Sequence, residues 1–184
     1  MENDLCQLMN SEIPQDWSSS LDRQLGASLD MLQVAIETAT EEMWDQDSDR
    51  PPFWRISYHI VFFIDYYFAT FRPGVIDIHE TYRHPEFLLK YADSYLDDDV
   101  EDKVVSKEDI LKYLNHSRQN LRGYIENDLE SQLWDESGFP WLKMSKAELL
   151  LYNMRHIMEH TAILNQILKK HGLPASSWKG ISKI

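Results

Sequence analysis

Apolar residues recur along this chain mainly at every third or fourth position, which is the spacing of an amphipathic α-helix. Only 6 glycines and 7 prolines interrupt the 184 residues. Hydrophobic residues make up 43% of the chain and charged residues 27%, so the sequence is apolar enough to bury a core and too apolar for intrinsic disorder. The pattern therefore predicts an all-α fold in a single domain over residues 1–184.

The first two of four long helices are predicted from their apolar stripes. The first begins near the SSSLD stretch and runs through Met43, until the DQDSDRPP tract interrupts it. The second covers PFWRISYHIVFFIDYYFATF, residues 52–71, with the Pro-Pro pair at its opening. Because this second segment is aromatic on more than one side, we expect it to be largely buried.

The last two long helices carry recognisable capping signals. Ser106 and Asp109 resemble a capping arrangement that opens the third helix. Ser145 with Glu148 three residues later forms a capping box for the fourth helix, and Gly172 provides a glycine C-cap at its end. These signals predict where the third and fourth helices begin and where the fourth ends.

The remaining segments lie outside the long helices. Residues 1–17 form an N-terminal segment and residues 173–184 a C-terminal tail. Residues 73–105 form a long excursion with one short helix from about Glu86 to Leu96. Four long helices with one long crossover between the second and the third predict a four-helix bundle.

The charge balance and the single cysteine limit the classes of partner and the compartment. The formal net charge is −13, with an isoelectric point near 4.8, which disfavours nucleic acids and anionic membranes as partners. Cys6 alone cannot form an internal disulfide. The N-terminus lacks the features of a signal peptide, and the longest apolar run is interrupted by Asp65 and too short to span a bilayer. We therefore expect a soluble, cytoplasmic protein.

Three histidines occupy positions where an amphipathic helix should present apolar side chains. The stripe of the fourth helix has spacings of four, three, four, three and four, and all its members are predicted to face the core: Leu149, Asn153, His156, His160, Ile163 and Ile167. The stripe of the second helix comprises Ile56, His59, Phe63 and Tyr66. A single histidine on such a stripe is usually a core residue with a hydrogen-bond partner.

Two histidines four residues apart point the same way from a helix and can share one metal ion. With His59 as a third imidazole on another buried helix, a metal site at His59, His156 and His160 is the simplest common explanation. Three imidazoles would leave coordination positions open for water or substrate, as in catalytic sites. A polar network within the core is the structural alternative. The other four histidines are expected to have structural roles only: His79, His84, His116 and His171.

The sequence HIMEH at residues 156–160 also matches an inverted zinc-protease signature, H-x-x-E-H. Such a site needs Glu159 as general base and a third ligand, normally a carboxylate well downstream. The segment after His160 contains neither aspartate nor glutamate. Glu159 is also about 100° around the helix from His160. A protease is therefore disfavoured, and Glu159 is expected on the helix surface or behind the ligands.

The layout of these motifs resembles the DinB/YfiT-like metal-binding superfamily. The resemblance rests on a histidine within the aromatic segment WRISYHIVFFIDYYF and on an H-x-x-x-H pair in LLLYNMRHIMEHTAILNQILKKHG, together with the crossover before the third helix. It implies a four-helix bundle in which His59, His156 and His160 bind a divalent metal such as nickel, zinc or iron. Some relatives are transferases that use a low-molecular-weight thiol, and relatives often form homodimers.

Two functions follow as hypotheses. The first is a metal-dependent enzyme of the thiol-transferase or hydrolase type, in which the metal activates a small thiol or water towards a small-molecule substrate. The second is a non-catalytic metal- or ligand-binding bundle with a stress or sensing role. Phe63 and Tyr66 are candidates for the walls of the site, and Asn153 and Tyr152 could contact a bound ligand or orient a histidine.

Overall fold

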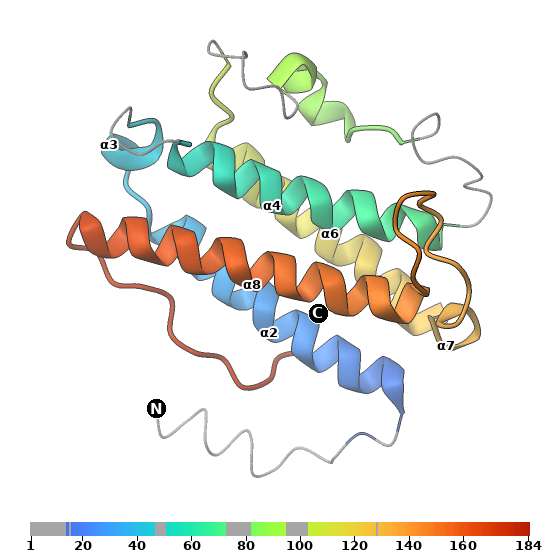
Figure 1. The fold of residues 1–184 in the computed structure, drawn as a ribbon. Coiled ribbons are helices and arrows are strands. Elements are labelled where there is room, and N and C mark those ends of the chain that lie inside the picture. The colour runs from blue at the N-terminus through green and yellow to red at the C-terminus, as the bar shows by residue number, and fades with distance from the viewer. Residues whose placement is uncertain (1–13, 15, 47–50, 73–81, 95–102, 128) are drawn as a thin grey trace.

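The protein is described here from a computed structural model that covers the chain except residues 1–13, 15, 47–50, 73–81, 95–102 and 128. Its four long helices are α2 (Trp17–Thr38), α4 (Phe53–Phe68), α6 (Lys107–Asn127) and α8 (Lys146–Lys170) (Figure 1). The shorter elements are α3 (Glu41–Trp44), α7 (Leu129–Gln132) and the 3-10 helices η1 (Ala69–Phe71) and η2 (Glu86–Ser94). The prediction of an all-α four-helix bundle is confirmed.

Each long helix packs against two others, in the order α2, α8, α4, α6 and back to α2. Ring contacts of His59 with His160 and of Tyr67 with Tyr152 show that α4 and α8 run antiparallel. The helices α4 and α6 run parallel, because Tyr58 packs against Tyr113 and Asp65, further along α4, reaches Asn120. A parallel pair requires a long return of the chain, which is the role of the excursion between them. No helix in the described part of the chain is long and apolar enough to cross a membrane.

The capping signals of the sequence lie where they were predicted. The Ser145 hydroxyl accepts a hydrogen bond from the Glu148 amide, and the Glu148 carboxylate accepts one from the Ser145 amide, so the capping box is complete. The Ser106 hydroxyl likewise accepts a hydrogen bond from the Asp109 amide at 3.1 Å. Gly172 follows α8 with a φ of 74°, a conformation that favours glycine.

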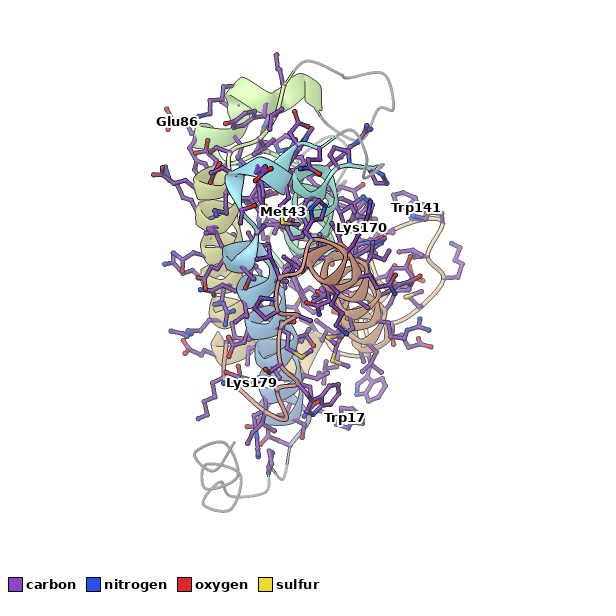
Figure 2. All side chains as sticks on the ribbon, turned by 90° about the vertical axis from the view of Figure 1, so that its left-hand side faces the viewer. Trp17, Met43, Glu86, Trp141, Lys170 and Lys179 are labelled. Atoms are coloured by element: carbon purple, nitrogen blue, oxygen red, sulfur yellow. The ribbon has the colours of Figure 1, made fainter. Side chains whose placement is uncertain are left out.

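One helix end and one helix type differ from the prediction. The first long helix ends at Thr38 and not at Met43, because Ala39 is extended and α3 starts anew after Thr40. Glu41 and Glu42 stand in the first turn of α3, where the helix dipole favours acidic groups. Met43 nevertheless reaches the core and closes one end of the bundle (Figure 2). The expected short helix near Glu86 is a 3-10 helix.

A buried carboxylate joins α4 to α6 and to the residues on either side of the segment 73–81. Asp65 is 1% exposed and pairs with Arg72 at 2.7 Å. It also accepts hydrogen bonds from the hydroxyls of Tyr82 at 2.9 Å and Tyr113 at 3.2 Å, and Asn120 lies 3.5 Å away. Because Arg72 precedes residues 73–81 and Tyr82 follows them, one side chain fixes both ends of that segment.

The tyrosines of this network act as hydrogen-bond donors. Burial and the charge of Asp65 raise the pKa of Tyr82 and Tyr113 well above the usual value, so both hydroxyls stay protonated. The two hydroxyl oxygens are 2.6 Å apart. The ion pair and these hydrogen bonds offset the free-energy cost of burying the Asp65 charge, a cost that an unpaired buried charge would leave uncompensated.

Replacing Asp65 by asparagine should therefore destabilise the protein by about 3 kcal/mol or more, because Arg72 loses its partner and two tyrosine donors lose a charged acceptor. Urea unfolding of the variant and the wild type measures the difference. The matched control is Asp30→Asn, since Asp30 pairs with Arg118 at 2.9 Å but its side chain is 29% exposed. The control should lose about 1 kcal/mol or less. Equal losses in the two variants would contradict the structural role of Asp65.

The segment after α8 returns along α2 and packs against it closely. The Ser182 amide donates to the Arg23 carbonyl at 3.1 Å, and Ile184 is 2% exposed. This approach depends on Gly26, because a Cβ atom there would lie 2.3 Å from the Ser182 carbonyl oxygen.

The variant Gly26→Ala should displace the tail from α2 and lower the free energy of unfolding by about 1–3 kcal/mol. Chemical denaturation provides the measurement. Gly123→Ala is the control, since Gly123 lies within α6 and a Cβ atom there meets nothing within 4 Å. That control should instead stabilise the protein by about 0.5–1 kcal/mol. A Gly26→Ala protein as stable as the control would show that the tail does not pack as described.

Candidate metal centre

The histidine pair of α8 lies at the edge of the helix face that is buried. The buried residues of α8 are Lys146, Leu149, Leu150, Asn153, Ile157, Thr161, Leu164 and Leu168. His156 and His160 are half-buried beside this face, and Ile163, predicted to face the core, is 38% exposed. The predicted stripe was therefore wrong at Ile163, whereas Ile167 packs against the core. The buried face of α8 is displaced from the stripe because α8 packs on α2 as well as on α4.

His59 stands in the middle of α4 and faces the pair on α8. Its ring centroid is 5.0 Å from that of His156 and 4.8 Å from that of His160. The rings of His156 and His160 are 4.6 Å apart, as expected for residues on successive turns of one helix. The structure thus brings together the three histidines that the sequence singled out, from positions far apart in the chain.

The ring nitrogens of the three side chains converge. One nitrogen of each lies within 4.8 Å of the others, and the Nε2 atoms of His59 and His156 are 3.0 Å apart. Two nitrogens at that separation can both lie about 2.1 Å from a common ion. Three neutral imidazoles are also a donor set that zinc, nickel and iron accept. The described residues therefore fit a divalent metal.

Burial keeps these imidazoles neutral. It lowers the pKa of His59 to about 4, with smaller contributions from the charges of His160 and Arg55. Burial lowers the pKa of His156 to about 3, reinforced by the two other histidines, and it lowers the pKa of His160 against the opposing charge of Glu159. Near neutral pH each ring consequently has one unprotonated nitrogen that can act as a ligand.

Aromatic side chains surround one side of the group. The Phe63 ring lies 4.8 Å from the ring of His59 and 5.4 Å from that of His156. Tyr67 packs on Phe63 at 5.2 Å and on the half-buried Tyr152 at 5.6 Å. A continuous aromatic surface therefore extends from the histidines along α4 and α8.

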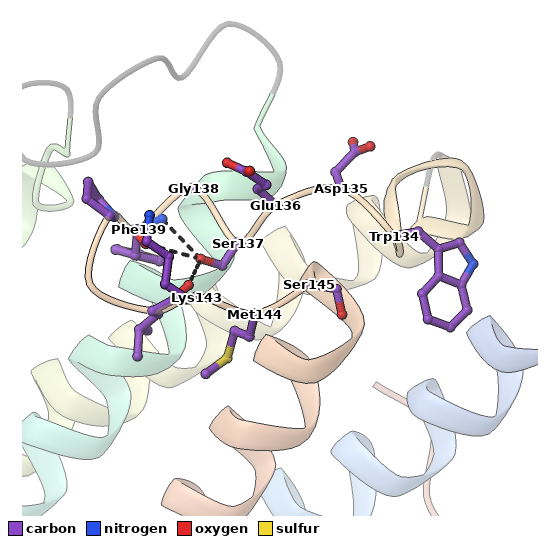
Figure 3. Close-up of a pocket in the computed structure, with 11 residues that line it drawn as sticks. Trp134, Asp135, Glu136, Ser137, Gly138, Phe139, Lys143, Met144 and Ser145 are labelled. Carbon is purple, nitrogen blue, oxygen red and sulfur yellow. Dashed lines mark hydrogen bonds between the residues drawn. The ribbon is translucent and has the colours of Figure 1, made fainter.

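The loop between α7 and α8 adds Phe139 to this surface. Phe139 packs on Tyr66 at 5.1 Å and on Tyr67 at 5.6 Å. The Ser137 hydroxyl holds the loop, accepting from the Phe139 amide at 3.1 Å and donating to the Leu142 carbonyl at 2.7 Å (Figure 3). The pocket of Figure 3 is lined by residues of this loop alone and includes none of the three histidines.

Comparison with known proteins identifies the superfamily of this chain. A family model for the DinB superfamily matches residues 24–164. The chain belongs to the DinB superfamily. The matched stretch contains α4, α6 and all three histidines. No curated protein and no solved structure gives a significant match.

Within this DinB-superfamily fold, the other candidate residues fall into different places. Phe63 borders the histidine group, and Tyr152 lies one ring further out, against Tyr67. Tyr66 is 6% exposed and packs in the aromatic layer with Phe139, next to Phe63. Asn153 is fully buried on the core side of α8, so it cannot contact a substrate that reaches the histidines from solvent. Glu159 is exposed and does not join the three histidines.

The remaining histidines lie apart from the centre where they are described. His84 is half-buried, with its Nδ1 atom 3.5 Å from the Tyr58 hydroxyl. His116 contacts Asn120 through its Nε2 atom at 3.0 Å, and His171 is the C-cap of α8. His79 and Cys6 lie outside the described residues.

The sequence patterns did not predict two features, the position of Phe139 beside α4 and the partners of Asp65. Phe139 comes from an irregular loop, and no periodic signal places such a residue beside α4. Asp65 was visible only as a charge interrupting an apolar run. A charged residue in a buried helix requires partners, and that rule could have predicted its network but not the identity of Arg72, Tyr82 and Tyr113.

The lowered pKa values predict an acid-sensitive stability in the metal-free protein. On unfolding, His59 and His156 regain a pKa near 6.5, so the unfolded chain binds more protons between about pH 6.5 and pH 4. Stability contributed by the neutral rings is full above pH 6.5 and falls as the pH decreases. The upper limit is about 1.4 kcal/mol per pH unit for one imidazole, and partial exposure of the rings reduces it.

Urea unfolding at pH 7 and pH 5 measures this effect in the wild type and in His156→Gln. The glutamine side chain does not titrate, so the variant should lose less stability between the two pH values. Carboxylates contribute equally to both proteins and cancel in the comparison. Identical losses would show that His156 is not kept neutral by burial.

Proposed function

We propose that this protein of the DinB superfamily binds one divalent metal ion through His59, His156 and His160, and that the bound ion activates a small thiol or water for attack on a small-molecule electrophile. The observation that carries the proposal is the convergence of three neutral imidazoles from α4 and α8. A protease of the inverted type finds no support, since Glu159 is exposed and apart from the group.

Three imidazole ligands are compatible with several metal ions, so they do not identify the ion. Nickel, zinc and iron all accept imidazole ligands, so each remains a candidate. A divalent ion bound there supplies Lewis acidity, which lowers the pKa of a thiol or water ligand. No carboxylate joins the histidines among the described residues, so the chain offers no obvious general base at the group itself.

The residues of the chain then have distinct tasks. The three histidines hold the ion while remaining neutral. Phe63 provides aromatic surface beside it, and Tyr152 extends that surface through Tyr67, which favours a substrate or thiol cofactor with apolar groups. Arg155 stands over the Tyr152 ring at 5.8 Å and adds a positive charge at that side. The thiol, a homodimer and the cytoplasmic location stay predictions.

Metal binding is tested by loading the purified protein with zinc or nickel, removing the excess and measuring bound ion by elemental analysis. We expect one ion per chain for the wild type and for the control His171→Ala, and none for His156→Ala. At a free-ion concentration of 100 times the dissociation constant, the ion should stabilise the wild type by about 2.7 kcal/mol, and a chelator should reverse this. A His156→Ala protein that keeps one ion per chain would exclude the three-histidine site.

Catalysis is separated from binding by a second experiment. The metal-loaded protein is incubated with a low-molecular-weight thiol and a panel of electrophiles, and thiol consumption is followed. The proposal requires turnover that disappears in the metal-free protein and in His59→Ala, while His171→Ala turns over at the wild-type rate. Full metal binding without turnover across a broad panel would instead support a non-catalytic binding bundle.

A further inference from the structure

Unpartnered buried polar atoms concentrate on the two turns of α8 that carry the histidine pair. In the described part of the chain, five such side-chain atoms have no hydrogen-bond partner: Ser117 Oγ, Asn153 Nδ2, Asn153 Oδ1, His156 Nδ1 and Thr161 Oγ1. Four of these five atoms belong to α8 between Asn153 and Thr161. Buried polar groups are almost always hydrogen-bonded in folded proteins, so a local group of exceptions needs a specific explanation.

His156 has two ring nitrogens in different surroundings. Its Nε2 atom faces His59 at 3.0 Å, on the side where an ion would lie, whereas its Nδ1 atom is buried without a partner. If Nε2 donates its lone pair to an ion, the neutral ring must carry its proton on Nδ1. A ligand histidine almost always donates that second N–H to an acceptor, which fixes the ring orientation. His156 therefore needs a buried acceptor near its Nδ1 atom.

Asn153 supplies an unpartnered buried acceptor on the turn before His156. It precedes His156 by three residues, so the two side chains are neighbours on the helix, with Cβ atoms about 5–6 Å apart. Side chains of a helix lean towards its N-terminus, and His156 therefore leans over the turn that contains Asn153. Asn153 is 0% exposed and its amide oxygen is unpartnered. Thr161 lies on the C-terminal side of His156, so the His156 side chain leans away from it.

We propose that Asn153 is the positioning residue of His156, whose Nδ1–H it binds through its amide oxygen, so that the Nε2 lone pair stays directed at the ion site. The consequence for metal affinity rests on the proposed function. The hydrogen bond itself does not: neither atom has a partner in the structure, so the bond requires the two side chains to rotate towards each other, and this rotation needs no ion. His59 would then donate its Nε2–H to His156 in the metal-free protein. Complete burial separates this role from direct contact with a substrate.

The test uses Asn153→Leu, which removes the amide at similar size. The control is Thr161→Val, which removes a buried unpartnered hydroxyl from the same helix. In the metal-free wild type, nitrogen-15 NMR of the histidine rings should show His156 protonated on Nδ1, with a slowly exchanging proton. Asn153→Leu should lose that signal and bind zinc about 10- to 100-fold more weakly. Thr161→Val should keep both the signal and the wild-type affinity.

Wild-type His156 protonated on Nε2 would overturn the proposal, and this measurement decides even if Asn153→Leu fails to fold. A folded Asn153→Leu protein with unchanged tautomer and unchanged zinc affinity would overturn it equally. A wild type that binds no ion, yet shows an Nδ1–H signal that Asn153→Leu removes, would support the positioning role and refute the metal function. The two failures are therefore distinguishable.

Discussion

The buried carboxylate of Asp65 is the interaction on which the arrangement of α4 depends. That helix is buried on nearly all sides, and its burial alone would leave its rotation and height weakly defined. Asp65 requires charged or hydrogen-bonded partners wherever it is buried, and it finds them in Arg72, Tyr82 and Tyr113. Satisfying this one group fixes α4 against α6. It thereby fixes the side of α4 on which His59 stands.

The helices and their ends were predictable because the signals are local. The capping box at Ser145 and Glu148 and the glycine at 172 act within a few residues, so the sequence determines them without the rest of the fold. The break after Thr38 was missed because the apolar stripe continues through Met43, although the backbone does not. Similarly, Ile163 follows the periodic stripe, but the position of α2 decides which face of α8 is buried.

The histidine group was predictable for a different reason, which is that polar residues stood in slots expected to be apolar. That anomaly identified His59, His156 and His160, and the structure places them together. Other features depend on how distant segments pack and could not be predicted. They are the separation between the Nε2 atoms, the contribution of Phe139, and the burial of Tyr66 and Asn153 away from solvent. The position of Glu159, by contrast, followed from the helical period, which places it about 100° around α8 from His160, and it is exposed and outside the group.

The contact between His59 and His156 also joins two distant points of the chain. These residues are 97 positions apart, and the intervening chain includes the excursion, all of α6 and the loop with Phe139. Any bridge between the two rings closes that stretch into a loop, and for as long as the bridge holds, the ends of the loop stay together, as a disulfide keeps them. An ion shared by them would thus act as a reversible cross-link in a protein whose single cysteine cannot provide one, and its release would loosen segments that never touch it.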